Sequence, residues 1–135
     1  MNNHRNVVFT PEIRFADIDA MGHVNNAVYL SYFEQARIHY FRELIGAEWD
    51  WKEHGILLAR NEIDYKIPIL LHDVIDILVW CGDAGNKSFT MNYSVVNRAT
   101  AAEVCTGKSI LVAFNYLTQE SVRVPDSWRE AFVDS

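Results

Sequence analysis

The segment from residue 27 to residue 46, AVYLSYFEQARIHYFRELIG, constrains the fold more than any other part of the chain. Apolar residues recur there at the spacing of one helix face, and polar residues mark another face. The apolar positions are Tyr29, Phe33, Ala36, Tyr40 and Leu44, and the more polar ones are Ser31, Gln35, His39 and Arg42. Gly46 follows where a left-handed cap is expected. The pattern predicts an amphipathic helix of about five turns, longer than average.

After this helix the apolar period changes to two. In residues 58–67, LARNEIDYKI, the apolar Ile63, Tyr65 and Ile67 alternate with polar neighbours, which predicts a half-exposed strand that ends at Pro68. Further strands are predicted over 73–85, 86–97 and 104–117, with Phe89, Met91, Tyr93 and Val95 on one face of the middle one. The short connections between these segments favour antiparallel hairpins.

The two ends of the chain complete the predicted order of elements. Residues 7–16 read as a first strand with an irregular part at Pro11, and residues 124–132 read as one helical turn. One helix covers only part of one face of such a sheet, so we expect a single α+β domain over residues 1–135, an antiparallel sheet wrapped around the helix. Pairing with a second copy protects the sheet edges, which predicts a homodimer or homotetramer.

Composition excludes several classes of protein. Half of the 135 residues are apolar, enough for a buried core, and the net charge of −6 argues against nucleic acid or an anionic membrane as partner. No apolar stretch has the length of a membrane span. Cys81 and Cys105 lie in apolar runs without metal-ligand spacing, which indicates buried thiols in a reducing compartment. We therefore expect a cytoplasmic protein.

The segment DIDAMGHVNN, residues 17–26, gathers hydrogen-bonding side chains just before the helix. Free N–H groups and the helix dipole at that point can stabilise an oxyanion, and Asp19 could act there as general base or nucleophile. The alternative is purely local: Asp19 makes an Asx turn, Gly22 supplies a positive φ, and Asn25 or Asn26 caps the helix. A metal site is disfavoured, because His23 has no second ligand at a suitable spacing.

The residues FADIDAMGHVNNAVYLSYFEQAR, followed by IDYKIPILLHD and GNKSFTMNYSV, resemble the hotdog-fold acyl-CoA thioesterases of the 4-hydroxybenzoyl-CoA thioesterase type. The HVNNAVY stretch is similar to the long-chain acyl-CoA and acyl-carrier-protein branches, and the resemblance covers residues 7–118. It implies a long helix wrapped by an antiparallel sheet. It also implies that the catalytic aspartate is Asp19 and not Asp17, so that Asp17 would serve as the control, and that the oxyanion donor is the N–H at or next to Asn26. His23 matches a proposed catalytic histidine, whereas Met21 replaces an asparagine of that branch.

The resemblance further implies an active site at a subunit interface, with acyl-CoA as substrate and no metal or redox cofactor. Glu62 could correspond to a downstream carboxylate, and Asn25 is expected to orient Asp19 or the attacking water. Tyr29 is expected to contact the substrate or to pack in the helix. The positions expected to bind the phosphates of CoA are Arg60, Lys66, Lys87 and Arg98.

The hypothesis from the sequence is hydrolysis of an acyl-CoA to a carboxylic acid and free CoA. The alternative is a non-catalytic hotdog module that binds acyl-CoA or a fatty acid. Release of free thiol separates the two. The acyl group, the choice between CoA and acyl carrier protein, and the choice between dimer and tetramer remain open at this stage.

Overall fold

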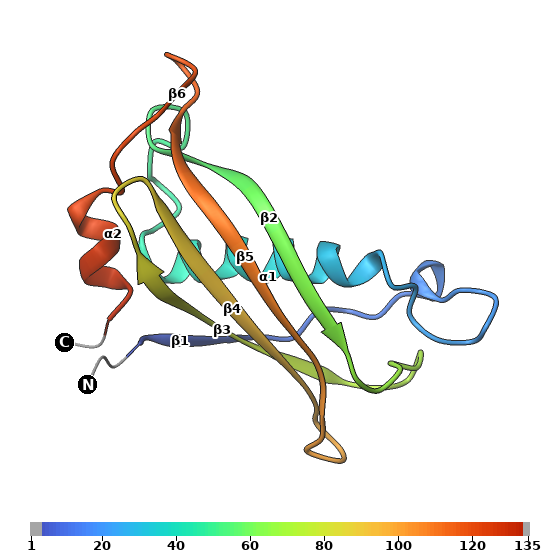
Figure 1. Cartoon of the computed structure of the whole chain (residues 1–135). Coiled ribbons are helices and arrows are strands. Elements are labelled where there is room, and N and C mark those ends of the chain that lie inside the picture. Colours follow the sequence, from blue (N-terminus) through green and yellow to red (C-terminus); the bar gives the residue numbers. More distant parts are fainter. Residues whose placement is uncertain (1–3, 134–135) are drawn as a thin grey trace.

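The computed structural model describes residues 4–133, which form one antiparallel sheet and a long helix that crosses one of its faces (Figure 1). In chain order the elements are β1 (Asn6–Phe9), a 3-10 turn (Phe15–Asp17), α1 (Val28–Leu44), β2 (Gly55–Tyr65), β3 (Ile75–Ala84), β4 (Ser88–Asn97), β5 (Glu103–Asn115), β6 (Glu120–Ser121) and α2 (Asp126–Ala131). The strand order is β1-β3-β4-β5-β2, and the short β6 pairs with β5. This arrangement confirms the predicted α+β class.

Helix α1 is buried along the face that its sequence pattern predicts. Its buried side chains are Tyr29, Tyr32, Phe33, Ala36, Tyr40 and Phe41. The ring of Phe33 stacks on Tyr93 of β4 with ring centroids 4.1 Å apart. A Cβ atom at Gly107 of β5 would collide with the Phe33 ring, so this position accepts only glycine if the ring stays in place. The helix ends as predicted, with Gly46 at a φ of +112°.

The remaining elements agree with their predicted positions, with three differences, the first of which is that β2 runs over Gly55–Tyr65 in place of residues 58–67. β1 ends at Phe9 instead of continuing to residue 16, since Pro11 has no N–H to donate to a neighbouring strand. The two residues of β6 have too little sequence pattern for prediction. In β4 the four predicted inward residues are all buried, and Cys81 and Cys105 are buried free thiols, as predicted. Within residues 4–133 no helix is long and apolar enough to cross a membrane.

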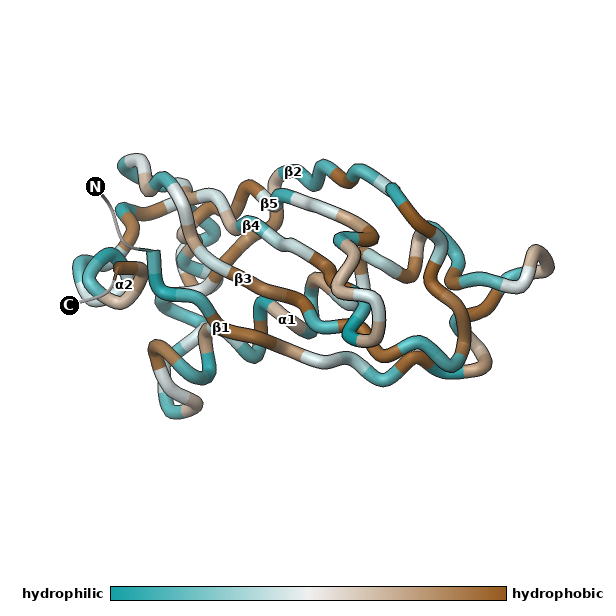
Figure 2. The backbone as a smooth tube through the Cα atoms, turned by 90° about the horizontal axis from the view of Figure 1, so that it is seen from below, coloured by the Kyte–Doolittle hydropathy of each residue, from teal (hydrophilic) through white to brown (hydrophobic). Residues whose placement is uncertain are grey.

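Strand β2 forms an exposed edge of the sheet, because among the described strands only β5 pairs with it. Its middle is mostly hydrophilic in Figure 2, whereas the middle of β3 is hydrophobic. Even so, Leu57, Leu58 and Tyr65 of β2 are large apolar side chains with substantial exposure, Tyr65 at 47%. An unpaired strand edge with exposed apolar side chains is the kind of surface that a second chain covers.

Candidate functional site

The polar segment 17–26 folds into a tight hairpin at the start of α1. Ile18 and Val24 form an antiparallel bridge, and the N–H of Asp19 donates to the carbonyl of His23 at 2.9 Å. The turn closes when the N–H of Gly22 donates to the carbonyl of Asp19 at 3.0 Å, and Gly22 has a φ of +90°. The predicted positive φ at Gly22 is therefore confirmed, and the hairpin fixes Asp19 beside the first turn of the helix.

The two carboxylate oxygens of Asp19 differ in their surroundings. Oδ1 accepts a hydrogen bond from the N–H of Met21 at 2.9 Å, the predicted Asx turn, and lies 3.9 Å from Nδ1 of His23. Oδ2 has no hydrogen-bond partner among residues 4–133, and the Asp19 side chain is 27% exposed. A turn contact and a free basic oxygen are thus compatible in one side chain.

The two asparagines before α1 also have different partners. Oδ1 of Asn25 accepts from the N–H of Ala27 at 2.9 Å, which is a local turn; the cap of α1 is Ala27 with no side-chain hydrogen bond, so neither asparagine caps the helix as the local alternative predicted. The carbonyl of Asn26 accepts from the hydroxyl of Tyr65 at 2.7 Å. In the described part of the chain, the N–H of Asn26 has no acceptor. A free N–H at the positive end of a helix can donate to an anion or to a polarised carbonyl.

Asp17 is a buried carboxylate, unlike Asp19, with only 2% of its surface exposed. It accepts hydrogen bonds from the backbone N–H and the guanidinium of Arg14, both at 3.0 Å, and from the hydroxyl of Tyr32 at 2.7 Å. Burial by itself raises the pKa of Asp17, but the hydrogen bonds from Arg14 and Tyr32 outweigh it and leave the pKa below its usual value of 3.8. Asp17 therefore ties the hairpin to α1.

We expect Asp17→Asn to lower the free energy of unfolding at pH 7 by about 1–3 kcal/mol, since it weakens hydrogen bonds to a buried charge. Because the pKa is depressed in the folded state, this stabilisation is present above the unfolded value of 3.8 and is lost as the pH falls through the lower folded value. Urea denaturation at pH 7 and at pH 3 measures both effects. Equal stability of the variant and the parent at pH 7 would contradict the assignment.

The structure does not bring Tyr29 and Glu62 to Asp19. Tyr29 is buried, with its ring edge-on to Tyr65 at 4.9 Å, and burial raises its pKa to about 12. Glu62 is exposed on the face of β2 opposite to α1, where it pairs with Arg60 at 2.8 Å and lies in register with Lys108. Within one chain, Tyr29 is a packing residue and Glu62 belongs to a surface ion pair.

The cationic positions predicted to bind phosphates do not form one cluster. Lys66 pairs with Glu103, and Arg98 pairs with Asp76 at 2.7 Å. The side chain of Lys87 has no partner in the described residues, but it lies in the β3–β4 connection near α2, whereas segment 17–26 lies at the other end of α1 (Figure 1). These cations provide no prearranged phosphate site within a single chain.

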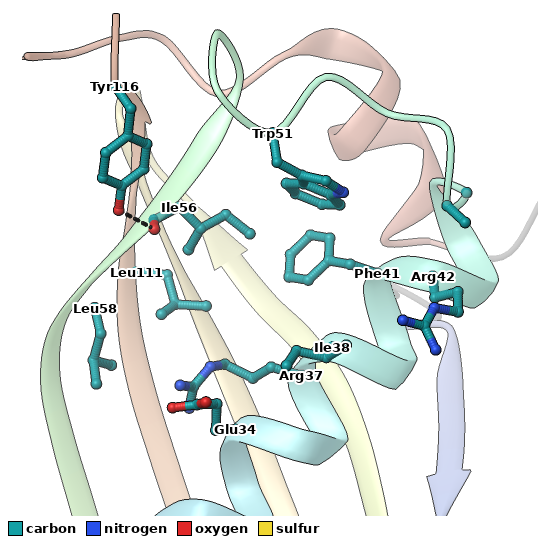
Figure 3. A pocket seen from close by; sticks show the side chains of 12 residues that line it. Glu34, Arg37, Ile38, Phe41, Arg42, Trp51, Ile56, Leu58, Leu111 and Tyr116 are labelled. Atoms are coloured by element: carbon teal, nitrogen blue, oxygen red, sulfur yellow. Dashed lines mark hydrogen bonds between the residues drawn. The ribbon is translucent and has the colours of Figure 1, made fainter.

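A cavity of about 540 Å³ lies between the second half of α1, the first half of β2, and β5 (Figure 3). We call it the chamber. Aromatic rings of Phe41, Trp51 and Tyr116 and aliphatic side chains such as Ile38 and Ile56 line it. The chamber was not predictable from the sequence, because it forms from segments far apart in the chain. Its size and apolar lining suit an organic ligand.

One end of the chamber is polar. Glu34 and Arg37 of α1 line it and lie together at the end away from Trp51, whereas Arg42 lies apart from them, next to Phe41 (Figure 3). The guanidinium Nη1 of Arg37 donates to the hydroxyls of Tyr93 at 3.2 Å and Ser109 at 3.4 Å. The sequence pattern gives no signal for the position of Arg37, because its hydrogen bonds join α1 to two strands more than 50 residues away.

The chamber and the hairpin lie toward opposite ends of α1 in the same chain. Phe41 is about 20 Å along the helix axis from Val28, at 1.5 Å per residue. None of the residues that line the chamber belongs to segment 17–26. Within one chain, the polar hairpin and the apolar chamber are therefore separated along α1.

Comparison with known proteins places this architecture in a family. A crystal structure of a thioesterase from Thermus thermophilus, complexed with coenzyme A and Zn, is 35% identical, with a TM-score of 0.81 over 93% of this chain and 90% of that one. A putative acyl-CoA thioesterase of Bacillus subtilis is 26% identical over 132 residues, 91% of this chain and 87% of that protein. A 1,4-dihydroxy-2-naphthoyl-CoA thioesterase from Synechocystis shares the fold, with a TM-score of 0.85 at 15% identity over 95% and 96% of the two chains.

The family match covers nearly the whole of the described chain. Residues 13–132 match the family described as the thioesterase-like superfamily. The same region contains the polar hairpin, α1, the chamber and all but the first strand. The helix wrapped by an antiparallel sheet agrees with the thioesterase structures named above and confirms the predicted hotdog fold. The chain belongs to the thioesterase-like superfamily.

Proposed function

We propose that this protein hydrolyses acyl-CoA thioesters to free carboxylic acids and CoA, with Asp19 as general base or nucleophile. The observation that carries the proposal is that the hairpin before α1 holds both the unpaired Oδ2 of Asp19 and the unpaired N–H of Asn26. Membership of the thioesterase-like superfamily supports the reaction class. The coenzyme A complex of the Thermus thermophilus thioesterase supports CoA as the carrier.

In the proposed reaction the thioester carbonyl accepts a hydrogen bond from the N–H of Asn26, which stabilises the oxyanion as it forms. Asp19 either takes a proton from the attacking water or attacks the carbonyl carbon to form an anhydride that water then opens. The C–S bond breaks, and the CoA thiolate takes up a proton. His23 and Asn25 lie in the same hairpin and orient the carboxylate and the start of the helix.

We also propose that the working unit is a homodimer formed through the edge of β2. Leu57 and Leu58 on β2, and Leu30 and Ile38 on α1, are exposed large apolar side chains, Ile38 at 51%. Antiparallel pairing of two β2 edges about a two-fold axis perpendicular to the sheet keeps both helices on one face and reverses the direction of α1. The partner's hairpin then approaches the second half of α1, where the chamber lies.

Release of free thiol from a panel of short-chain, long-chain and aromatic acyl-CoAs tests the function. We expect time-dependent thiol release from at least one class, which a thiol-reactive chromophore measures continuously. Saturable binding of acyl-CoA without thiol release over long incubation would contradict hydrolysis and favour a non-catalytic binding module. Cys81 and Cys105 are buried, so their thiols leave a low background in this assay. Their unpaired state supports a cytoplasmic location.

A further inference from the structure

Arg37 presents unused hydrogen-bond donors to the chamber. Its Nη1 donates to two neutral hydroxyls, of Tyr93 and Ser109, whereas its Nε and Nη2 have no acceptor among residues 4–133. No carboxylate of the described residues lies within 4.0 Å of its guanidinium nitrogen atoms. Arg37 is half-buried and lines the chamber, so its free N–H groups are available to an acceptor on a bound ligand.

The groups behind Arg37 are satisfied without it. The hydroxyl of Tyr93 donates to Oγ of Ser109 at 2.8 Å, and that hydroxyl donates to Oδ1 of Asn61 at 2.6 Å. Both hydroxyls only accept from Arg37, so the chain of hydrogen bonds persists when the guanidinium is removed. The network therefore holds Arg37 in position but does not explain why an arginine is there.

Glu34 lies one helical turn before Arg37 and lines the same end of the chamber (Figure 3). That end thus offers a cationic donor and an anionic acceptor, whereas aromatic and aliphatic side chains surround the rest of the space. A hydroxyl group can accept from Arg37 and donate to Glu34 at the same time. A carboxylate would face the charge of Glu34, and a hydrocarbon has no atom that accepts a hydrogen bond from Arg37.

We propose that Arg37, with Glu34, selects acyl groups that carry a hydroxyl at the end remote from the thioester. This inference rests on the proposed function, with the chamber as the acyl site. In the two-fold arrangement the partner's hairpin enters beside the C-terminal end of α1, so the thioester lies near Arg42 and the acyl group extends toward Arg37. Arg37 contacts the substrate there as a specificity residue and takes no part in breaking the thioester bond.

The test compares acyl-CoAs with the same skeleton. The pairs are 4-hydroxyphenylacetyl-CoA with phenylacetyl-CoA, and 8-hydroxyoctanoyl-CoA with octanoyl-CoA. Octanedioyl-CoA, which carries a carboxylate in place of the terminal hydroxyl, is the fifth compound. In at least one pair we expect the hydroxylated member to have a kcat/KM about 10-fold higher or more, the range of a hydrogen bond to a charged group. The pair that shows the preference tells whether the acyl group is aromatic or aliphatic.

Variants then assign the preference to Arg37. We expect Arg37→Met to bring the kcat/KM values of the two members of that pair within about twofold of each other, because the hydrogen bond to the hydroxyl is lost. Arg37→Lys keeps the charge without the planar fork and should keep only part of the preference. Lys108 is an exposed residue on the outer face of β5. Lys108→Met removes the same charge as Arg37→Met and should leave the preference for the hydroxylated acyl-CoA unchanged. Circular dichroism confirms that each variant is folded.

The outcomes separate the two proposals. Hydrolysis by the unmodified protein with no hydroxyl preference in either pair overturns the role of Arg37 and leaves the thioesterase function intact, and this arm needs no variant. A preference that survives in folded Arg37→Met, or a stronger preference for octanedioyl-CoA, also overturns it. No thiol release from any of the five compounds overturns both.

Discussion

Replacement of Asp19 by asparagine is expected to lower kcat for acyl-CoA hydrolysis by about 10²–10⁴-fold. The amide keeps the size of the carboxylate and an oxygen that can accept from the N–H of Met21, so the Asx turn is retained. It has no basic or nucleophilic oxygen in place of the free Oδ2. Because the side chain is 27% exposed and has no buried partner, stability should change little. Thiol release at saturating substrate, beside a thermal melt, measures both quantities.

A matched control distinguishes loss of the base from loss of a surface charge. Asp83→Asn makes the same chemical change at an exposed position of β3 that has no hydrogen bond within the described residues, and it should keep full activity. Asp17→Asn is unsuitable as the control because Asp17 is buried and ties the hairpin to Arg14 and Tyr32. Hydrolysis by folded Asp19→Asn within threefold of the parent would refute the role of Asp19.

Local interactions explain why the hairpin could be predicted from the sequence. The Asx turn at Asp19 and the positive φ at Gly22 depend on residues at most three apart. The same holds for α1, whose buried face follows from the spacing of its own side chains. The burial of Asp17 was not predictable in this way, because it depends on Tyr32 in the next element.

The side to which Glu62 points depends on a single irregularity in β2. The pairing of β2 with β5 shifts between Leu58 and Arg60, so one extra residue reverses the alternation of faces. Leu58 lies opposite the buried Leu111, and after the shift Asn61 lies opposite the buried Ser109. Glu62 therefore points away from α1. The alternation of apolar and polar residues in the sequence gives no signal for such a bulge. The chamber and the hydrogen bonds of Arg37 also depend on the pairing of β2 with β5, which joins residues far apart in the chain.

A shared active site predicts that two inactive variants restore each other. Asp19→Asn lacks the base and keeps an intact chamber. Ile56→Trp keeps the base and adds bulk at a half-buried position that points into the chamber (Figure 3). If each site combines the hairpin of one protomer with the chamber of its partner, a mixed dimer has one complete site and one with both defects. Random mixing makes half of the dimers mixed, so an equimolar co-refolded sample should recover about one quarter of the parent activity.

The control mixes Asp19→Asn with the double variant Asp19→Asn/Ile56→Trp, which contains no base in any dimer and should stay inactive. Sedimentation equilibrium must show an even multiple of the 15.6 kDa chain, and mass spectrometry under native conditions must show that mixed dimers form. Mixed dimers without recovered activity would mean that the hairpin works with a site in its own chain. Recovery above the control would require that Asp19 of one protomer acts on the chamber of its partner, because neither variant chain holds both an intact base and an open chamber.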